Sequence, residues 1–234
     1  MSKDIKEDIT VSWGNFLAVR IASISLETDT ISEINNYIDS TTYKDILTYD
    51  KSMDLVGQTR QDKKSAQLYM PLSDEVPSSF AEYLSDIAGY YAADHGVEVR
   101  KSIVQSMWSV HNYAGDYNPL HDHHLADKAE FREPDSGLSC ILYLKVPEEI
   151  SSLPPMNGGE FQYGNSGFCD GHTQFVWGST SKSDRLAFKQ PSNIYIKPKE
   201  GLLLMFPLWL QHLVQPFYGD GERRSLSANI ALYV

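Results

Sequence analysis

The hydrophobic pattern of the chain changes in kind near Gly96. Before this glycine, apolar residues recur at helical spacing, three or four positions apart. Ile31, Ile34 and Ile38 follow the start signal Thr28-Asp29-Thr30, and they predict a short amphipathic helix. A second, longer helix is predicted from Phe80 to His95, ending at Gly96, since glycine is the usual residue just past a helix.

The longer helix carries a start signal of its own. Ser79 and Glu82 have the spacing of a capping box, in which each side chain accepts a hydrogen bond from the other residue's backbone N–H. Its predicted apolar stripe consists of Phe80, Tyr83, Leu84, Ile87 and Tyr91. Such a stripe indicates a helix that packs against a sheet.

After Gly96 the pattern becomes that of short strands separated by Gly, Pro and Asn. The predicted strands are 102–113, 117–123, 138–146, 159–163, 173–176, 193–196, 201–206, 212–217 and 223–234, with one earlier strand at 16–24. Residues 50–64 are polar and irregular. Many short strands without intervening helices are typical of a sandwich or jelly roll.

The order of elements therefore predicts an α+β, mainly β protein. Residues 1–98 supply a strand and helices that brace one sheet face, and residues 99–234 form the β core, in a single compact domain overall. Two polar stretches, 128–136 and 179–189, are predicted to be mobile loops beside a site, and both are candidates for closing over a substrate.

Composition narrows the setting of this fold. The chain of 234 residues is 41% hydrophobic and 22% charged, and its net charge of −11 disfavours nucleic acid as a partner. Two cysteines, Cys140 and Cys169, are too few for a disulfide scaffold, which indicates a reducing, cytoplasmic setting. The charged N-terminus has no apolar signal core, and no apolar stretch is long enough to span a membrane. A soluble protein without a membrane anchor is expected.

Three histidines carry the most informative chemistry. His121 and His123 are two residues apart on a predicted strand, so their imidazoles face the same side, and His212 lies far downstream. Neutral imidazole suits iron, zinc, copper and nickel. Three such ligands on one face of a metal leave three positions open, two for a chelating oxo-acid and one for dioxygen.

The histidine set departs from the usual pattern of two histidines and one carboxylate, because His123 stands where the carboxylate is expected. An all-histidine site has one negative charge fewer, which should alter the redox behaviour of iron. Asp122 or Asp127 could replace His123 as a ligand only if the strand ended in a turn that redirected the carboxylate.

A basic anchor follows the third histidine. Residues 223, 225, 227 and 229 are polar, whereas the alternating positions 226, 228 and 230 are apolar, so one face of the last strand is polar. If that face lines a cavity, Arg223 can bind a carboxylate through two parallel hydrogen bonds and Ser225 can donate to the same group. If it faces solvent, both residues are ordinary surface residues.

The chain resembles the iron(II)- and 2-oxoglutarate-dependent oxygenases over residues 100–234. Residues 197–207, followed by His212 and Arg223-x-Ser225, look like the C-terminal half of that family's double-stranded β-helix, a cupin-like jelly roll. Asn157-Gly158-Gly159-Glu160 is similar to a segment of the prolyl-hydroxylase branch. Residues 138–147 resemble a strand of a bacterial and phage group of oxygenases with a His-x-His motif. This chain has Cys140 where that group has a glycine, which implies tighter packing near the site.

The resemblance implies roles for particular residues. His121, His123 and His212 become the metal ligands, and Arg223 becomes the partner of the distal carboxylate of 2-oxoglutarate, with Ser225 beside it. Tyr143 becomes a second hydrogen-bond donor to that carboxylate, or else a core tyrosine, and Asn112 becomes a lining residue. The implied cofactors are Fe(II), 2-oxoglutarate as cosubstrate, and O2.

The function expected on these grounds is a 2-oxoglutarate-dependent dioxygenase that hydroxylates a protein or peptide side chain, such as proline. One alternative is a three-histidine dioxygenase that does not use 2-oxoglutarate, which would have no need of Arg223. Another is a non-catalytic metal-binding β-fold protein. Nucleic-acid demethylation is disfavoured by charge. A homodimer is among the partners considered, and a phage-encoded protein would act in the host cytoplasm.

Overall fold

Strands form two antiparallel sheets in this computed structural model, which describes residues 19–55, 66–125, 133–154, 167–178 and 192–234. The six-stranded sheet runs β1 (Ala22–Ser25), β8 (Leu202–Pro207), β5 (Ser136–Lys145), β10 (Arg223–Tyr233), β3 (Lys101–Asn112) and β2 (Ala66–Tyr69). The four-stranded sheet runs β4 (Asn118–His121), β9 (Gln211–Val214), β6 (Thr173–Val176) and β7 (Asn193–Ile196). The protein is thus mainly β, with antiparallel sheets and few helices.

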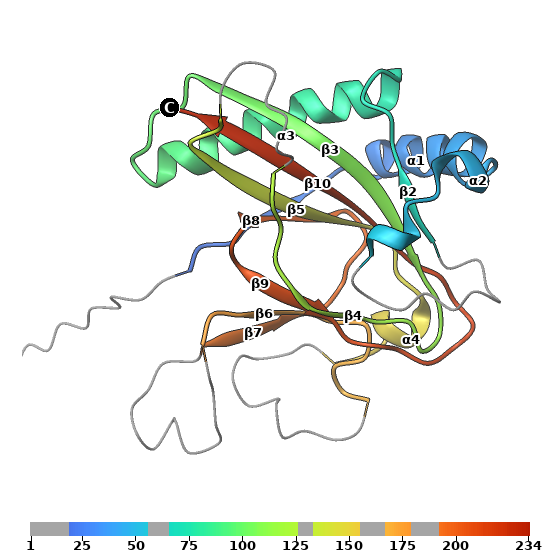
Figure 1. Ribbon diagram of the computed structural model, residues 1–234. Coiled ribbons are helices and arrows are strands. Elements are labelled where there is room, and N and C mark those ends of the chain that lie inside the picture. The colour runs from blue at the N-terminus through green and yellow to red at the C-terminus, as the bar shows by residue number, and fades with distance from the viewer. Residues whose placement is uncertain (1–18, 56–65, 126–132, 155–166, 179–191) are drawn as a thin grey trace, which may run out of the picture.

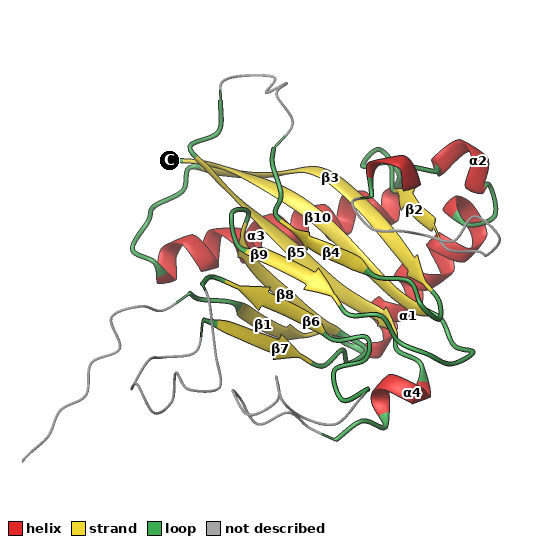
Figure 2. Ribbon diagram, turned by 60° about the horizontal axis from the view of Figure 1, so that its bottom comes forward, coloured by secondary structure: helices red, strands yellow, loops and turns green. Residues whose placement is uncertain are grey.

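The two longest helices, α1 and α3, lie on one side of the large sheet, and the small sheet lies on the other (Figures 1 and 2). The helical elements are α1 (Thr28–Tyr37), the π-helix η1 (Ile38–Thr42), α2 (Ile46–Tyr49), the 3-10 helix η2 (Ser52–Asp54), α3 (Glu75–Asp94) and α4 (Glu148–Ser151). None of the helices in the described part of the chain is long and apolar enough to cross a membrane.

The core has two parts, one on each face of the large sheet. On the helix side, Leu84 and Ala88 of α3 pack in one cluster with Met107, Leu142 and Leu226 of the strands. Between the sheets, a smaller cluster contains Ile141, Tyr143, Phe175, Leu204, Phe206 and Leu210. Each buried leucine stabilises the fold by about 1.5–3 kcal/mol, so both clusters hold the central strands in place.

Most predicted elements occur close to their expected positions, and the exceptions have physical causes. Helix α3 begins at Glu75 and therefore contains Ser79, so the predicted capping box is wrong. Pro77 fits the first turn of a helix and allows this earlier start. Tyr83, predicted to be in the apolar stripe, is 40% exposed. Gly96 has φ 73°, as expected for the residue that ends the helix.

Two strand predictions also need correction. Strand β4 ends at His121 and not at residue 123. Strand β2 was not predicted, and it forms one edge of the large sheet beside β3. The predicted strand 159–163, the loop 179–189 and most of the loop 128–136 lie outside the described residues.

Candidate active site

Three imidazoles meet where β4 and β9 pair. His121 lies directly opposite His212 in the antiparallel register, and His123 follows just after β4. One side-chain nitrogen from each of the three histidines lies within 4.8 Å of the others. The Nε2 atoms of His123 and His212 are 3.2 Å apart. The structure therefore brings together the three residues that the sequence nominated as ligands.

The path of the chain differs from the plain strand expected for His121 and His123. The pairing of β4 with β9 is irregular between Asn118 and His121, and residues 122–125 form no regular secondary structure. The backbone N–H of His123 instead donates to the carbonyl of Leu208, at 3.1 Å. This contact with the turn before β9 holds His123 at the cluster.

Backbone carbonyls fix the tautomers of two of the histidines. Nδ1 of His121 lies 2.7 Å from the carbonyl oxygen of Pro119, and Nδ1 of His212 lies 3.1 Å from that of Leu210. A carbonyl only accepts hydrogen bonds, so each Nδ1 carries the proton. The Nε2 atom is then unprotonated, which is the form that binds a metal; in the structure, Nε2 of His121 lies 3.3 Å from Asn118 Nδ2.

Burial keeps the cluster neutral. Desolvation, together with a smaller effect of the neighbouring histidines, lowers the pKa of His123 to about 4 and that of His212 to about 3. Desolvation also lowers the pKa of His121. Three neutral imidazoles with converging lone pairs fit a divalent transition metal, iron included.

The carboxylate alternatives do not join this cluster in the described structure. An Oδ1 oxygen of Asp122 lies 3.3 Å from Nε2 of His124, an exposed residue. Asp122 does not share the set of converging ligand atoms. Asp127 lies outside the described residues. Within the described chain, the converging set consists of histidines alone.

Arg223 is a buried cation without a carboxylate partner among the described residues. It starts β10, and only 1% of its surface is exposed. Its Nε donates to the carbonyl of Gly171 at 3.1 Å, and its two terminal nitrogens donate to Asn112 Oδ1 and Thr173 Oγ1. All three acceptors are neutral. An unpaired buried charge is costly, so this arrangement is suited to an anion.

The other nominated residues surround Arg223 in different ways. Ser225 and Asn112 line the same cavity as Arg223, and Asn112 touches its guanidinium. Tyr143 is fully buried between the sheets, and its hydroxyl donates to Thr173 Oγ1 at 2.7 Å. The sequence did not nominate Thr173, because a threonine in a predicted strand gives no signal that two site residues will share its hydroxyl.

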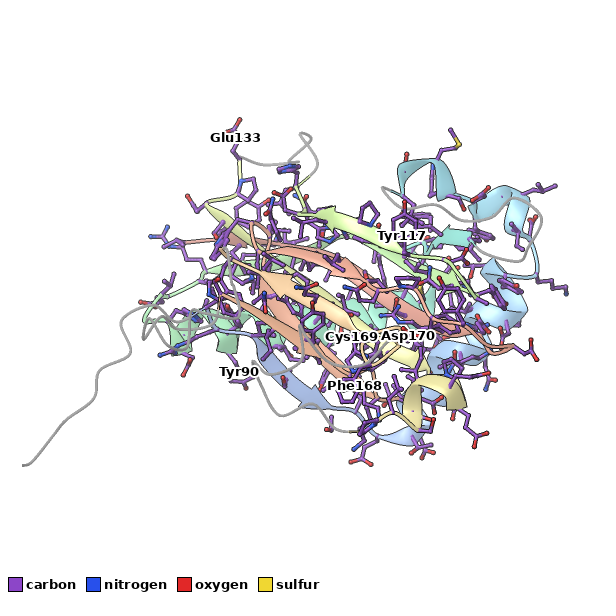
Figure 3. The ribbon with its side chains drawn as sticks, turned by 90° about the horizontal axis from the view of Figure 1, so that it is seen from below. Tyr90, Tyr117, Glu133, Phe168, Cys169 and Asp170 are labelled. Atoms are coloured by element: carbon purple, nitrogen blue, oxygen red, sulfur yellow. The ribbon has the colours of Figure 1, made fainter. Side chains whose placement is uncertain are left out.

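Cys140 does not tighten the site, contrary to expectation. It lies in the cluster on the helix side of the large sheet, whereas its neighbours on β5, Ile141 and Tyr143, lie between the sheets. Residues alternate between the two faces of a strand, so position 140 faces away from the histidines. Cys169 is free and half-buried in the turn before β6, beside Asp170 (Figure 3).

A cavity of about 370 Å³ joins the histidines to Arg223. Its floor is the face of β10 that carries Arg223, Ser225, Ser227 and Asn229, so the polar face predicted by the alternating pattern lines a cavity, one of the two settings that the pattern allowed. Val110 and Trp108 of β3 complete this floor. Neither Trp108 nor Asn229 was singled out as a site residue, because nothing in the sequence indicates how far the cavity extends.

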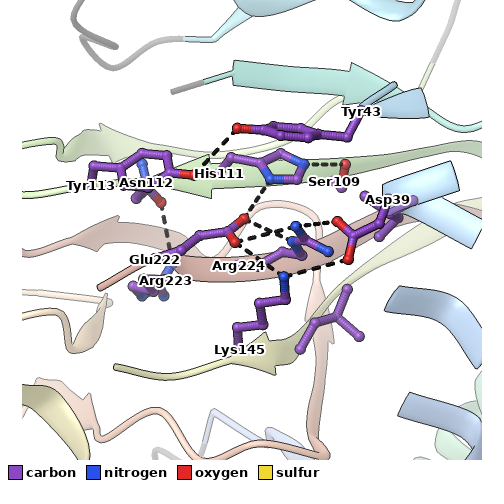
Figure 4. Close-up of polar contacts among 12 residues, drawn as sticks. Asp39, Tyr43, Ser109, His111, Asn112, Tyr113, Lys145, Glu222, Arg223 and Arg224 are labelled. Atoms are coloured by element: carbon purple, nitrogen blue, oxygen red, sulfur yellow. Dashed lines mark hydrogen bonds and ion pairs between the residues drawn. The ribbon is translucent and has the colours of Figure 1, made fainter. Parts of the chain in front are cut away.

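The opposite face of β10 carries an ionic network (Figure 4). Arg224 donates to Glu222 Oε1 at 2.8 Å and to Asp39 Oδ1 at 2.7 Å, and Lys145 lies 3.2 Å from Glu222 Oε2. His111 contacts the same Glu222 carboxylate, at 2.7 Å. Burial raises the pKa of Glu222, but hydrogen bonds from His111 and Arg224 outweigh that effect and lower it to about 2. The network ties η1 to the sheet.

Comparisons with known proteins agree with this geometry. Residues 106–229, more than half of the chain, match the sequence profile of the family described as "Putative 2OG-Fe(II) oxygenase". A search of curated proteins finds no match.

Several solved structures share the fold. A prolyl-4-hydroxylase from Pseudomonas putida has a TM-score of 0.54 at 12% identity, covering 92% of this chain and 94% of that one. The viral collagen prolyl hydroxylase of Paramecium bursaria Chlorella virus-1, solved with 2OG, has a TM-score of 0.50 at 16% identity, covering 92% and 96%. HygX from Streptomyces hygroscopicus, solved with nickel and 2-oxoglutarate, has a TM-score of 0.54 at 12% identity, covering 91% of this chain and 82% of that one.

The family match confirms the resemblance and, with it, the predicted cofactors Fe(II), 2-oxoglutarate and O2. With three neutral histidines converging beside a cavity and a buried arginine at one end of it, the chain belongs to the 2OG-Fe(II) oxygenases.

Proposed function

We propose that this protein is an Fe(II)- and 2-oxoglutarate-dependent dioxygenase that hydroxylates a substrate. His121, His123 and His212 would hold the metal through Nε2. Arg223 would bind the distal carboxylate of 2-oxoglutarate, with Ser225 and Asn112 beside it in the cavity. The bound iron and 2-oxoglutarate supply the oxidising chemistry.

The observation that carries this proposal is the uncompensated guanidinium of Arg223. Its contacts in the described structure are neutral oxygens and the ring of Tyr143, whose centroid lies 5.3 Å from the guanidinium carbon. Burial lowers the pKa of Arg223, but an arginine stays charged at neutral pH. A carboxylate entering the cavity would neutralise that charge.

The chain's own residues then have separate tasks. The carbonyls of Pro119 and Leu210 hold His121 and His212 in the tautomer that offers Nε2. Thr173 holds both Arg223 and Tyr143 in place, so Tyr143 acts through Thr173 in addition to any contact of its own with the cosubstrate. Apolar residues such as Phe175 and Phe206 pack against His212 and exclude water from that side.

The substrate proposed is a protein or peptide side chain, with proline as the first candidate. Support comes from the likeness of fold to prolyl hydroxylases from Pseudomonas putida and from a chlorella virus. The Gly158-Gly159-Glu160 segment that first suggested this substrate lies outside the described residues. A homodimer and a cytoplasmic location belong to the same proposal.

The architecture proposed is a double-stranded β-helix, with the helices of residues 1–98 bracing the core formed by residues 99–234. In support, α3 packs on the helix-side face of the large sheet. The N-terminal part also contributes β1 and β2 to opposite edges of that sheet, which favours one compact domain.

A three-histidine dioxygenase without 2-oxoglutarate is the alternative that fits the ligand set best. Neither this alternative nor a non-catalytic metal-binding protein would bind a ligand whose carboxylate neutralises the buried charge of Arg223. Succinate formed from 2-oxoglutarate would exclude both alternatives.

The test is an anaerobic titration of the protein with Fe(II) and 2-oxoglutarate, followed by its visible charge-transfer absorption. We expect a band that requires both the metal and 2-oxoglutarate, and that is lost in Arg223→Ala at the 2-oxoglutarate concentration that half-saturates the wild type. A folded, iron-loaded wild type without any such band would refute the proposal. Loss of iron from Arg223→Ala would contradict the role given to this arginine.

A further inference from the structure

The cavity continues past the histidines, away from Arg223, and its far end has a different chemistry. In the register of β10 with β3, Ser227 lies opposite Trp108 and Asn229 lies opposite Ser106. All four residues line the cavity. These four residues therefore present an amide, two hydroxyls and an indole, and none of them is charged; the charged residues that line the cavity are Lys51, Asp54, Asp122 and Arg223.

Asn229 presents an unpartnered acceptor at this far end. The residue is 8% exposed, and its Nδ2 donates to the backbone carbonyl of His124 at 3.3 Å. Its Oδ1 is buried and has no hydrogen-bond partner within the described part of the chain. A flipped amide would set Oδ1 against a carbonyl oxygen, which is also an acceptor, so the orientation is fixed.

Trp108 supplies the apolar surface next to that acceptor. Its indole ring lies 5.7 Å from the ring of His123, centroid to centroid. Trp108 is partly exposed and sits between Ser227 on β10 and Tyr69 on β2 in the sheet register. A group resting on this indole would lie beside the histidine cluster.

We propose that Asn229 and Trp108 form the substrate-binding subsite and select a neutral molecule that donates a hydrogen bond to Asn229 Oδ1. A saturated group of the same molecule packs on Trp108, which places its C–H bonds near the histidines. A charged group would find no counter-ion among Asn229, Trp108, Ser106 and Ser227, and burying it against them would be unfavourable. The inference rests on the proposed function, because it assigns the substrate side of the same cavity.

The donor can be an amide N–H, as in a peptide, or a hydroxyl, and three small probes separate these sources. N-cyclopentylacetamide carries a ring and an N–H, N-acetylpyrrolidine carries a ring and a carbonyl but no N–H, and cyclopentylmethanol carries a ring and a hydroxyl. Dissociation constants would be measured by NMR titration of protein loaded with zinc and 2-oxoglutarate, which cannot turn over.

We expect wild-type protein to bind at least one donor-bearing probe roughly three- to tenfold more tightly than N-acetylpyrrolidine, the range for one hydrogen bond. Asn229→Leu should abolish that preference. Asn36→Leu, the same change on the exposed side of α1, should retain it. Trp108→Ala should weaken the binding of all three probes while the preference for a donor remains.

Equal affinity of wild-type protein for all three probes would overturn the inference, and this outcome needs no variant to fold. A preference unchanged in folded Asn229→Leu would also overturn it. Binding of 2-oxoglutarate is measured in the same samples. If 2-oxoglutarate does not bind the wild type, the proposed function fails; if it binds and no probe shows a donor preference, only the subsite fails.

Discussion

Arg223 and Arg224 are neighbours on β10, each only 1% exposed, yet they sit in opposite electrostatic environments. Arg224, on the helix side, contacts the carboxylates of Glu222 and Asp39. Arg223, on the cavity side, contacts only neutral acceptors among the described residues. The difference teaches that one buried charge is paired within the fold, whereas the other has no carboxylate partner among the described residues, which supports the proposal that a ligand neutralises it.

The same contrast separates the buried histidines. His111 lies on the helix side and contacts both Glu222 and Ser109. His121, His123 and His212 lie on the cavity side, with one ring nitrogen of each close to the others. Pairing with an oppositely charged group favours stability, whereas neutral imidazoles that converge on one point favour binding of a metal.

The largest expected effect is on stability, from Arg224→Met. The variant removes the guanidinium that Glu222 and Asp39 share and leaves Glu222 with Lys145 and His111 alone, which should cost about 3–5 kcal/mol in the free energy of unfolding. Arg223→Met removes an unpaired charge and should leave that free energy unchanged or increase it. Chemical denaturation of both metal-free variants measures the difference, and equal losses would break the comparison.

The next largest effect is on metal affinity, from His212→Ala. Loss of a ligand should exceed the 10- to 100-fold typical of outer contacts, so the dissociation constant for Fe(II) should rise more than about 100-fold. His124→Ala is the matched control, because His124 is 89% exposed and contacts Asp122. If both variants bound iron alike, the histidine cluster would not be the metal site.

A smaller effect is the dependence of stability on pH through Glu222. Its pKa is lowered from 4.5 to about 2 in the folded protein, so its contribution is complete above about pH 5 and is lost as pH falls towards 2. This contribution amounts to roughly 3 kcal/mol. Glu222→Gln should flatten the fall in unfolding free energy between pH 5 and 3. Parallel curves for the variant and the wild type would show that other acids are responsible.

The smallest effect expected is that of Tyr143→Phe. The variant loses the hydrogen bond to Thr173 Oγ1, which is worth about 0.5–1.5 kcal/mol. Since Thr173 also contacts Arg223, the affinity for 2-oxoglutarate should fall by less than tenfold. Isothermal titration would detect a larger loss, which would indicate that the Tyr143 hydroxyl binds the cosubstrate directly.

Local pattern predicted much of this molecule. The alternation along residues 223–230 correctly separated a polar face from an apolar core face, because the period of a strand is a local property, but only the structure showed that the polar face lines a cavity. The three histidines could be nominated for the same reason, together with the resemblance to the oxygenases.

Contacts between distant segments could not be predicted. The pairing of His121 with His212 depends on the register of β4 with β9, and the shared hydroxyl of Thr173 depends on where β6 meets Tyr143. The capping box at Ser79 failed because Pro77 permits an earlier start to α3. The unpartnered acceptor Oδ1 of Asn229 could be identified only from the structure, in which the carbonyl of His124 accepts from Nδ2 of the same amide.

The central claim is that the buried guanidinium of Arg223 binds the distal carboxylate of 2-oxoglutarate. The most direct measurement compares 2-oxoglutarate with 2-oxopentanoate, which lacks the distal carboxylate, by isothermal titration of nickel-loaded wild type and Arg223→Met. We predict that the wild type prefers 2-oxoglutarate by about 100-fold, and that Arg223→Met binds the two acids alike. A preference that survives in Arg223→Met would contradict the account.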